Sequence, residues 1–335
     1  MMVNRRANNV VFGFDFQVNA AIVLMLKDIK KLSSLKLEGN YEDIELCFND
    51  GEYILAQAKG INEPISDTRN VRKNLKKALE TLSEGEKAVK TKKLIFITNS
   101  RNPLNENITN SVFEGESYRE YSTLSSSSKE IIDQCLSNIE EPLDTKKLMI
   151  QILPFETDNE DERYKIVKTK IDEFLVDLNL SIRGIGKKVM SIWQNNVFEN
   201  ATKKNADIKL TKAQIVWPLI CIITDMEKNG DDILRIMDES IYEEVVYRYH
   251  DLIDMYTEKF SFITKVIYDY SDFKSNRIRS ERFLDFIEKS WELYKEDFAL
   301  ADDDVELEKV LIQVILYTIL KNRLTIKKIK EGVGL

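Results

Sequence analysis

Residues 42–60, EDIELCFNDGEYILAQAKG, place two apolar runs on either side of an Asn-Asp-Gly turn. This arrangement predicts a β-hairpin, and the turn resembles the type I′ turns that commonly join two strands. The second run ends on polar side chains, at Gln57 and Lys59. A core strand that ends with an amide and an ammonium side chain indicates that the end of this hairpin has a function.

The geometry of a hairpin brings a carboxylate to the same place. Side chains alternate along a strand, so Gln57 and Lys59 share one face. Asp43 stands at the start of the partner strand, which an antiparallel pairing sets beside Lys59. Oxygen ligands of this kind suit Mg²⁺, which keeps several of its waters. A metal ion there would polarise a phosphodiester, and the lysine would stabilise the charge that develops on the phosphate.

The same three residues also have a purely structural interpretation. Asp43 would then cap a strand, Gln57 would pair in an edge ladder, and Lys59 would extend its ammonium group into solvent. An acidic residue followed by Gln-x-Lys within about twenty residues is a short pattern, so the pattern alone does not decide between the two interpretations.

Composition limits the chemistry available to such a site. Of 335 residues, 43% are hydrophobic and 32% charged, as in globular proteins that bury a core. His250 is the only histidine, which nearly excludes imidazole catalysis. Three cysteines lie far apart, which predicts free thiols in a reducing compartment. The sequence lacks a run of about 18 apolar residues, which a membrane span would need. We therefore expect a cytoplasmic protein without a membrane partner.

The pattern around the hairpin predicts an α/β domain. Apolar side chains nearly encircle residues 14–32, which indicates a buried helix. Residues 71–82 place apolar side chains on one helical face. The short runs KLIFIT (93–98) and KLMIQIL (147–153) are typical of buried strands. Helices that alternate with strands predict a mixed central sheet flanked by helices.

Strand patterns stop near the acidic segment ETDNEDE, which begins at residue 156. Helical patterns continue from there to the end of the chain. We therefore predict an α/β domain over residues 1–157 and an all-α domain over residues 158–335.

A basic segment follows the hairpin. Residues 69–93 contain nine basic and three acidic side chains, although the whole chain has a net charge of −8. Basic side chains four residues apart form a stripe on the predicted helix. The stripe consists of Arg69, Arg72, Lys73, Lys76 and Lys77. It is either the solvated face of a helix or a surface that holds a phosphate backbone.

The order of elements, α-β-β-α-β, resembles the restriction-endonuclease-like PD-(D/E)xK superfamily. In that pattern a metal-binding Asp starts one strand and a (D/E/Q)xK element ends the next. Three stretches carry the resemblance: GFDFQVNAAIVLMLKDI (13–29), YEDIELCFNDGEYILAQAKG (41–60) and LIFITNS (94–100). More narrowly, they look like the double-stranded DNA endonuclease domain of bacterial anti-phage effectors, above all the nuclease subunit of Lamassu-type systems. The resemblance covers roughly residues 10–155.

The resemblance implies a role for each residue that matches the motif. Asp43 would be the principal metal ligand, and Gln57 the second ligand through its carbonyl oxygen. Lys59 would be the catalytic lysine. Gln17, which matches a Gln of the first helix, would help to place the metal or its water.

Many relatives have carboxylates where this chain has its two glutamines, so the implied site is poorer in negative charge. Two neighbouring carboxylates, Glu45 and Glu42, are the fallback ligands. Glu45 has the strand parity of Asp43, whereas Glu42 does not.

The implied function is a Mg²⁺-dependent endonuclease, in which Mn²⁺ can substitute, that cuts double-stranded DNA with low sequence specificity. It would be the effector of an anti-phage or anti-plasmid defence complex, with an SMC-like ATPase and an accessory subunit as partners. The all-α domain would dock to a partner or form a homo-oligomer, and the basic stripe would position the duplex without reading it. Two alternatives stay open: an inactive nuclease-fold interaction subunit, and a stand-alone restriction endonuclease.

Overall fold

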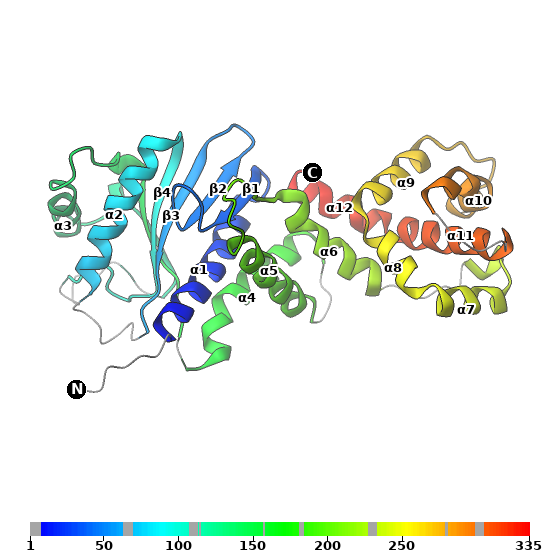
Figure 1. Cartoon of the computed structure of the whole chain (residues 1–335), viewed down its shortest axis with the longest axis horizontal. Coiled ribbons are helices and arrows are strands. Elements are labelled where there is room, and N and C mark those ends of the chain that lie inside the picture. Colours follow the sequence, from blue (N-terminus) through cyan, green and yellow to red (C-terminus); the bar gives the residue numbers. More distant parts are fainter. Residues whose placement is uncertain are drawn as a thin grey trace. The chain divides into compact units, whose positions relative to one another are not determined.

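The computed structural model describes residues 8–62, 70–106, 113, 115–156, 158–180, 184–226, 233–278, 281–298 and 305–335. These residues form two compact units (Figure 1). The sheet unit comprises the chain up to Ile215 together with Gly334 and Leu335, and the helical unit comprises residues 216–333.

The sheet unit is built on a seven-stranded sheet with the order β5-β6-β4-β3-β2-β1-β7. The strands are β1 (Leu32–Leu37), β2 (Ile44–Phe48), β3 (Tyr53–Lys59), β4 (Thr91–Thr98), β5 (Ser117–Glu120), β6 (Leu148–Ile152) and β7 (Leu210–Thr211). Strands β3, β4 and β6 run parallel to one another, and the other pairings are antiparallel. The prediction of a mixed sheet is therefore confirmed.

Helices cover both faces of this sheet (Figure 1). Helix α1 (Asn8–Lys27) packs against β1 and β3, and helices α4 (Glu160–Asp177) and α5 (Ile185–Ala201) pack against α1. Helix α2 (Val71–Ala88) packs on β3 and β4, with α3 (Ser126–Leu136) beside it. Because both faces are covered, the central strands are buried almost throughout, as their continuous apolar runs predict.

The central hairpin has the predicted strands but a different turn. Type I′ needs positive φ at two central residues, whereas Gly51, with φ of 78°, is the only residue of the turn with positive φ. The Gly51 N–H donates to the Phe48 carbonyl at 2.9 Å. This is the three-residue loop in which glycine takes the left-handed position, so the expectation of a type I′ turn was wrong.

The first helix ends earlier than predicted, since the apolar pattern indicated a helix up to residue 32. Helix α1 stops at Lys27, and the chain then forms β1, a strand that the sequence pattern did not indicate. The sequence of β1, LSSLKL, does not alternate cleanly between apolar and polar residues. This strand matters for the site, because it ends at the same rim of the sheet as β3.

By length and composition, residues 9–27 of α1 form the one helix in the described ranges that is long and apolar enough to cross a membrane. Its middle is buried inside the sheet unit: Phe16, Ala20, Ala21, Ile22 and Val23 are fully buried. Such burial is typical of the central helix of a globular domain.

The compact division of the chain lies at residues 215/216 rather than at the predicted boundary of 157/158. Phe155, the residue before the acidic segment, packs against Phe12 and Phe16 of α1. Hydrogen bonds then fix α4 and α5 to α1. The Tyr164 hydroxyl donates to Asp15 at 3.0 Å, and the Gln194 amide donates to Asn19 at 2.8 Å.

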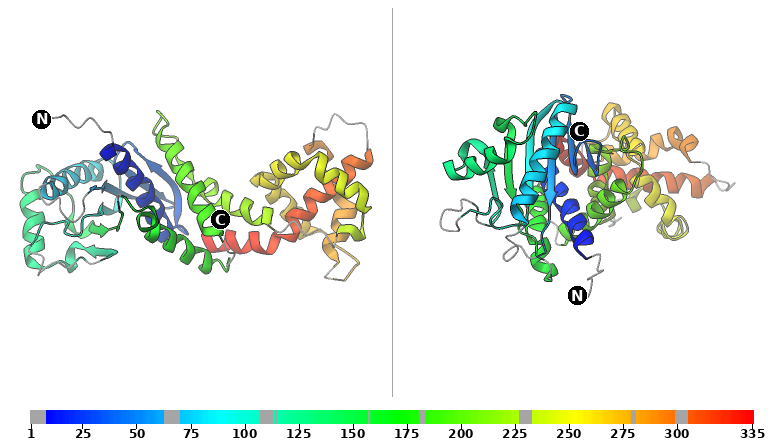
Figure 2. Two further views of the ribbon diagram at one scale, coloured as in Figure 1. Left: turned by 90° about the horizontal axis from the view of Figure 1, so that it is seen from below. Right: turned by 60° about the vertical axis from the view of Figure 1, so that its left-hand side comes forward.

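The helical unit contains no strand among its described residues. Its helices are the end of α6 (Lys212–Met226), α7 (Glu239–Arg248), α8 (His250–Glu258), α9 (Phe260–Asp272), α10 (Arg282–Ser290), α11 (Val305–Lys321) and α12 (Arg323–Val333). Helix α11 is buried on nearly all sides and contacts each of the helices α7 to α10 and α12 (Figure 2). The prediction of a helical C-terminal region is confirmed.

Candidate functional site

Asp43 and Lys59 meet at one rim of the sheet, as the hairpin predicts. Asp43 directly precedes β2, and Lys59 is the last residue of β3. The Lys59 Nζ lies 3.5 Å from Asp43 Oδ2, and the same oxygen accepts the Ala58 N–H at 3.1 Å. The Lys59 and Asp43 side chains are 29% and 17% exposed. The pair is therefore partly shielded from water and still open to a ligand.

Gln57 lies beside this pair, with both ends of its amide group engaged. Its Nε2 donates to Glu42 Oε2 at 2.9 Å, and its Oε1 accepts the Thr81 hydroxyl at 3.2 Å. Gln57 is 4% exposed. Its predicted role as a metal ligand through Oε1 stays a prediction, and it requires that Thr81 release or share this oxygen.

Glu42, one of the two fallback ligands, is a buried carboxylate that is 7% exposed. Its Oε2 also accepts the Asp43 N–H at 2.9 Å. Its Oε1 is buried and has no well-formed hydrogen bond among the described residues. The Thr81 hydroxyl interacts with the Glu42 carboxyl group, but its single proton is shared with Gln57 Oε1 and the Ala78 carbonyl. Burial raises the pKa of Glu42 to about 7.

Glu45, the other fallback ligand, shapes the loop that leads into β2. Its Oε1 accepts the backbone N–H groups of Tyr41 at 2.6 Å and of Glu42 at 3.4 Å. Gly39 leaves room for this arrangement, since a Cβ there would lie 2.2 Å from the Glu45 carboxyl group and would displace it. Burial raises the pKa of Glu45. The structure therefore supports a structural role for this residue.

Gln17 reaches the rim through a residue that sequence reasoning missed. Glu38 follows the last residue of β1, and its N–H donates to the Asp43 carbonyl at 2.8 Å. The Gln17 side chain, on α1, hydrogen-bonds the Glu38 carboxyl group. Burial and the Asp43 carboxylate raise the pKa of Glu38, whereas Gln17 and Lys59 act in the opposite direction. The only signal in the sequence is the position of Glu38 five residues before Asp43.

The predicted basic stripe divides between two flanks of α2. Thr81 and Gly85 mark the flank that faces the rim, because Thr81 contacts Gln57 and Gly85 packs against Tyr41. Lys77 lies one turn before Thr81 on this flank. Lys73 lies one further turn before Lys77, and both lysines are exposed.

Arg72 and Lys76 lie on the opposite flank of α2, towards α3, where their charges act on the Cys135 thiol. Lys76 pairs with Glu80 at 3.8 Å, and Arg72 donates to the Asn105 carbonyl at 3.4 Å. Arg69 lies outside the described residues. Of the described members of the stripe, Lys77 is thus the best placed for a ligand at the rim.

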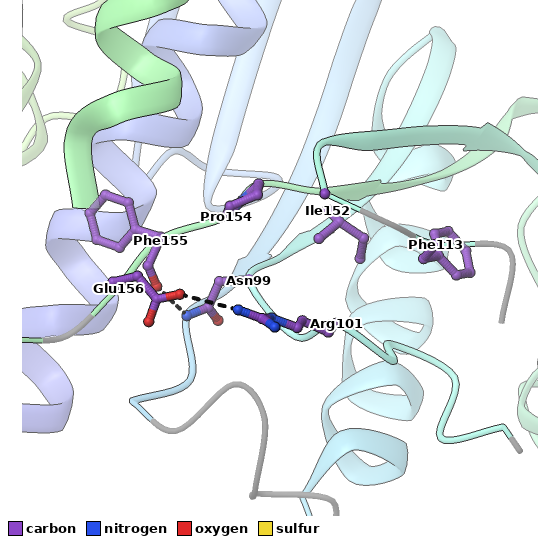
Figure 3. Close-up of a pocket in the computed structure, with 8 residues that line it drawn as sticks. Asn99, Arg101, Phe113, Ile152, Pro154, Phe155 and Glu156 are labelled. Carbon is purple, nitrogen blue, oxygen red and sulfur yellow. Dashed lines mark hydrogen bonds and ion pairs between the residues drawn. The ribbon is translucent and has the colours of Figure 1, made fainter. Parts of the chain in front are cut away.

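A cavity of about 440 Å³ lies beside the ends of β4 and β6 (Figure 3). It is lined by Asn99, Arg101, Phe113, Gly115, Ile152, Pro154, Phe155 and Glu156. The buried Asn99 side chain accepts the Ile61 N–H at 2.7 Å and donates to the Phe155 carbonyl at 2.9 Å. It therefore fixes the chain two residues after Lys59, and it supports the rim without taking part in it.

No three His, Cys, Asp or Glu side chains of the described residues form a ready-made metal cage. Mg²⁺ does not require one, since one or two carboxylates, substrate phosphates and waters commonly hold it. At the rim the backbones of Glu38 and Asp43 are hydrogen-bonded and their carboxyl groups act on each other, and the buried Glu42 Oε1 has no well-formed hydrogen bond among the described residues. This set of oxygen donors fits a hard cation.

Comparison of the chain with protein-family models, with curated proteins and with solved structures found no match.

Proposed function

We propose that this chain is a Mg²⁺-dependent endonuclease that cleaves double-stranded DNA with low sequence specificity. The observation that carries the proposal is the 3.5 Å pair of Asp43 and Lys59 at the rim of a mixed sheet. The order of the elements, a buried helix, the strand β1, a hairpin, a crossing helix and a parallel strand, supports the restriction-endonuclease-like pattern.

In this proposal Asp43 is the principal ligand of the ion, and the Ala58 N–H and Lys59 fix the orientation of its carboxylate. The ion, which Mn²⁺ can also supply, contributes Lewis acidity at the scissile phosphate. Lys59 stabilises the negative charge that develops on the phosphate, in a partly shielded place where such an interaction is stronger than in water. Gln57 and Glu42 hold the base of the rim through their shared hydrogen bond.

Purified protein, plasmid and Mg²⁺ or Mn²⁺ test this activity. We expect Asp43→Asn and Lys59→Met each to reduce the cleavage rate by about 10²–10³-fold, since each removes a group that acts on the transition state. Lys90→Met is the matched control. Lys90 pairs with Glu52 at 2.9 Å near the start of β3, at the opposite end from Lys59, so this variant should cut normally.

The products of the same reaction separate the remaining candidates. Discrete fragments would indicate a site-specific restriction endonuclease, whereas progressive degradation supports low specificity. The inactive interaction subunit has one observation in its favour, the engagement of both ends of the Gln57 amide. That candidate prevails if the wild-type protein cuts with neither metal, even when its partner ATPase is present.

The rim-facing flank of α2 supplies the phosphate contacts. We expect Lys77→Gln to weaken duplex binding several-fold for every sequence and to lower the salt dependence by about one counterion. Binding is measured in the Lys59→Met background, so that cleavage does not interfere. Lys76→Gln is the matched control, because Lys76 faces α3 and pairs with Glu80. Equal losses in both variants would contradict this path for the duplex.

The resemblance extends the proposal to a cytoplasmic defence complex directed against phages or plasmids, with an SMC-like ATPase and an accessory subunit. The helical unit would dock to such a partner or to a second copy of the chain. It exposes large side chains that suit a contact, including Tyr247, which is 91% exposed, Tyr268 and Leu293. Light scattering on the purified chain tests for a homo-oligomer, and inspection of the neighbouring genes tests for the ATPase.

A further inference from the structure

Glu38 occupies a position that a connecting loop does not require. Leu37 pairs with Ile44, and the Glu38 N–H continues the ladder to the Asp43 carbonyl at 2.8 Å. In the same register Ile44 pairs with Ala56, so Asp43 stands opposite Gln57. Glu38 and Asp43 therefore stand directly beyond the paired ends of β1 and β2, at the rim where β3 ends with Gln57 and Lys59.

The backbone of Glu38 is in an unfavourable conformation for its residue type. Its φ of 52° lies in the left-handed region, which glycine adopts freely and a long side chain does not. Strain of this kind persists where the surrounding structure or a function requires the side chain. A glycine would complete the turn at lower cost, so the glutamate side chain is the feature that needs an explanation.

The charges at the rim are unbalanced. The Asp43 carboxylate acts electrostatically on the Glu38 carboxyl group and on the Glu42 carboxyl group, and Lys59 is the cation that acts on all three residues. Like charges this close are costly unless a counter-charge joins them. An independent observation points the same way, since Glu42 is 7% exposed and its Oε1 has no well-formed hydrogen bond among the described residues, the Thr81 hydroxyl being shared with Gln57.

We propose that Glu38 is the second carboxylate of the cation site and that Gln17 is the positioning residue that holds it. The inference rests on the proposed function and adds a ligand to the proposed metal site. Such a ligand is needed because the motif has glutamines at positions 17 and 57 and is short of negative charge. Glu38 restores this charge from the end of β1. Gln17 then acts on the ion through Glu38 rather than as a ligand of its own.

Binding of Mn²⁺ alone tests the inference without any turnover. The full chain is titrated with Mn²⁺, and the free ion is counted by its paramagnetic resonance signal. We expect Glu38→Gln to weaken Mn²⁺ binding by at least about 10-fold. Glu52→Gln, at the turn of the hairpin, is the matched control and should bind as the wild type does.

Glu38→Gly separates a role in binding from a role in folding. Glycine relieves the left-handed backbone, so this variant should melt no earlier than the wild type and should still lose Mn²⁺ affinity. Gln17→Ala should weaken binding less than Glu38→Gln. It should have no further effect in the Glu38→Gln background, because a positioning residue acts only through its partner.

The outcomes distinguish this inference from the proposed function. If Asp43→Asn loses Mn²⁺ while Glu38→Gln and Glu38→Gly retain it, the inference is overturned and the nuclease proposal stands. If the wild-type chain neither binds Mn²⁺ nor cuts DNA, both are overturned. Parallel losses in the Asp43 and Glu38 variants, at unchanged melting temperature, support the inference.

Discussion

The two units of this chain treat a buried carboxylate in opposite ways. In the helical unit, Asp285 is 1% exposed, lies 2.8 Å from the Lys289 Nζ and 3.5 Å from the Arg277 Nε, and accepts the Ser275 hydroxyl. The Lys289 ammonium group, with Ser275 and Arg277, lowers the pKa of Asp285. The protein itself supplies every counter-charge that this carboxylate needs.

At the rim of the sheet unit the balance is reversed. Each carboxylate has one oxygen without a well-formed hydrogen bond among the described residues, but at Asp285 that oxygen lies in two ion pairs. Glu42 is buried almost as deeply, and it has two hydrogen bonds on its other oxygen and the shared Thr81 hydroxyl. Its pKa is raised to about 7 by burial. The pKa of Asp285 is lowered by a structural ion-pair network, whereas the raised pKa of Glu42 is the kind of perturbation that we attribute to the proposed cation site. This contrast distinguishes the two sites more clearly than burial does.

The largest stability effect is expected at the structural carboxylate. Asp285→Asn removes two ion pairs from a buried acceptor, and we expect it to lower the free energy of unfolding by about 1–2 kcal/mol. Chemical denaturation measures this loss for the free energy of unfolding, and hydrogen exchange measures it locally at α10. DNA cleavage should be unchanged, and a loss of cleavage without a loss of stability would break the comparison.

The pH dependence of this effect has a definite sign. Because the pKa of Asp285 is lowered in the folded state, its contribution is complete above the ordinary carboxyl pKa of about 4 and is lost as the pH falls below it. The difference between the wild type and Asp285→Asn should therefore be constant above about pH 5 and shrink below pH 4. A difference that instead grows on acidification would mean that the ion pairs do not stabilise the fold.

The meeting of Asp43 with Lys59 could be predicted from sequence because it depends on local geometry alone. A three-residue turn and two short strands fix the register, and the register then fixes which side chains lie together. The helices flanking the hairpin carry strong periodic patterns, so the mixed sheet followed too. These features need no knowledge of distant residues.

The strand β1, and with it Glu38, depends on partners that the local pattern does not reveal. Lys36, the last residue but one of β1, is fully buried, and its Nζ donates to the Asn200 carbonyl at 2.8 Å, 164 residues away. A lysine within a short run of mixed polarity is not typical of a buried strand. The division between the two units differs from the predicted boundary for the same reason. Asp15 and Asn19 on α1 bind α4 and α5 through long-range hydrogen bonds, which keep these helices in the sheet unit.

The second substitution that tests the comparison is Glu42→Gln, and its expected effect on stability is smaller and of opposite sign. A glutamine side chain can still accept the hydrogen bonds from Gln57 and Asp43 through its carbonyl oxygen. Its amide nitrogen takes the place of Oε1, which has no well-formed hydrogen bond. This nitrogen can donate to the Thr81 hydroxyl oxygen. The exchange removes a buried charge and leaves the shape unchanged.

We therefore expect Glu42→Gln to leave the free energy of unfolding unchanged, or to raise it by up to about 1 kcal/mol, when measured at pH 8 by chemical denaturation. The same variant should bind Mn²⁺ more weakly than the wild type. The buried negative charge of Glu42 destabilises the folded chain, but it attracts a cation, and glutamine lacks it. Opposite signs for Asp285→Asn and Glu42→Gln sharpen the distinction between the two units. If Glu42→Gln instead costs as much stability as Asp285→Asn and leaves Mn²⁺ binding intact, Glu42 is a structural carboxylate, and the open oxygen at the rim is no sign of a ligand.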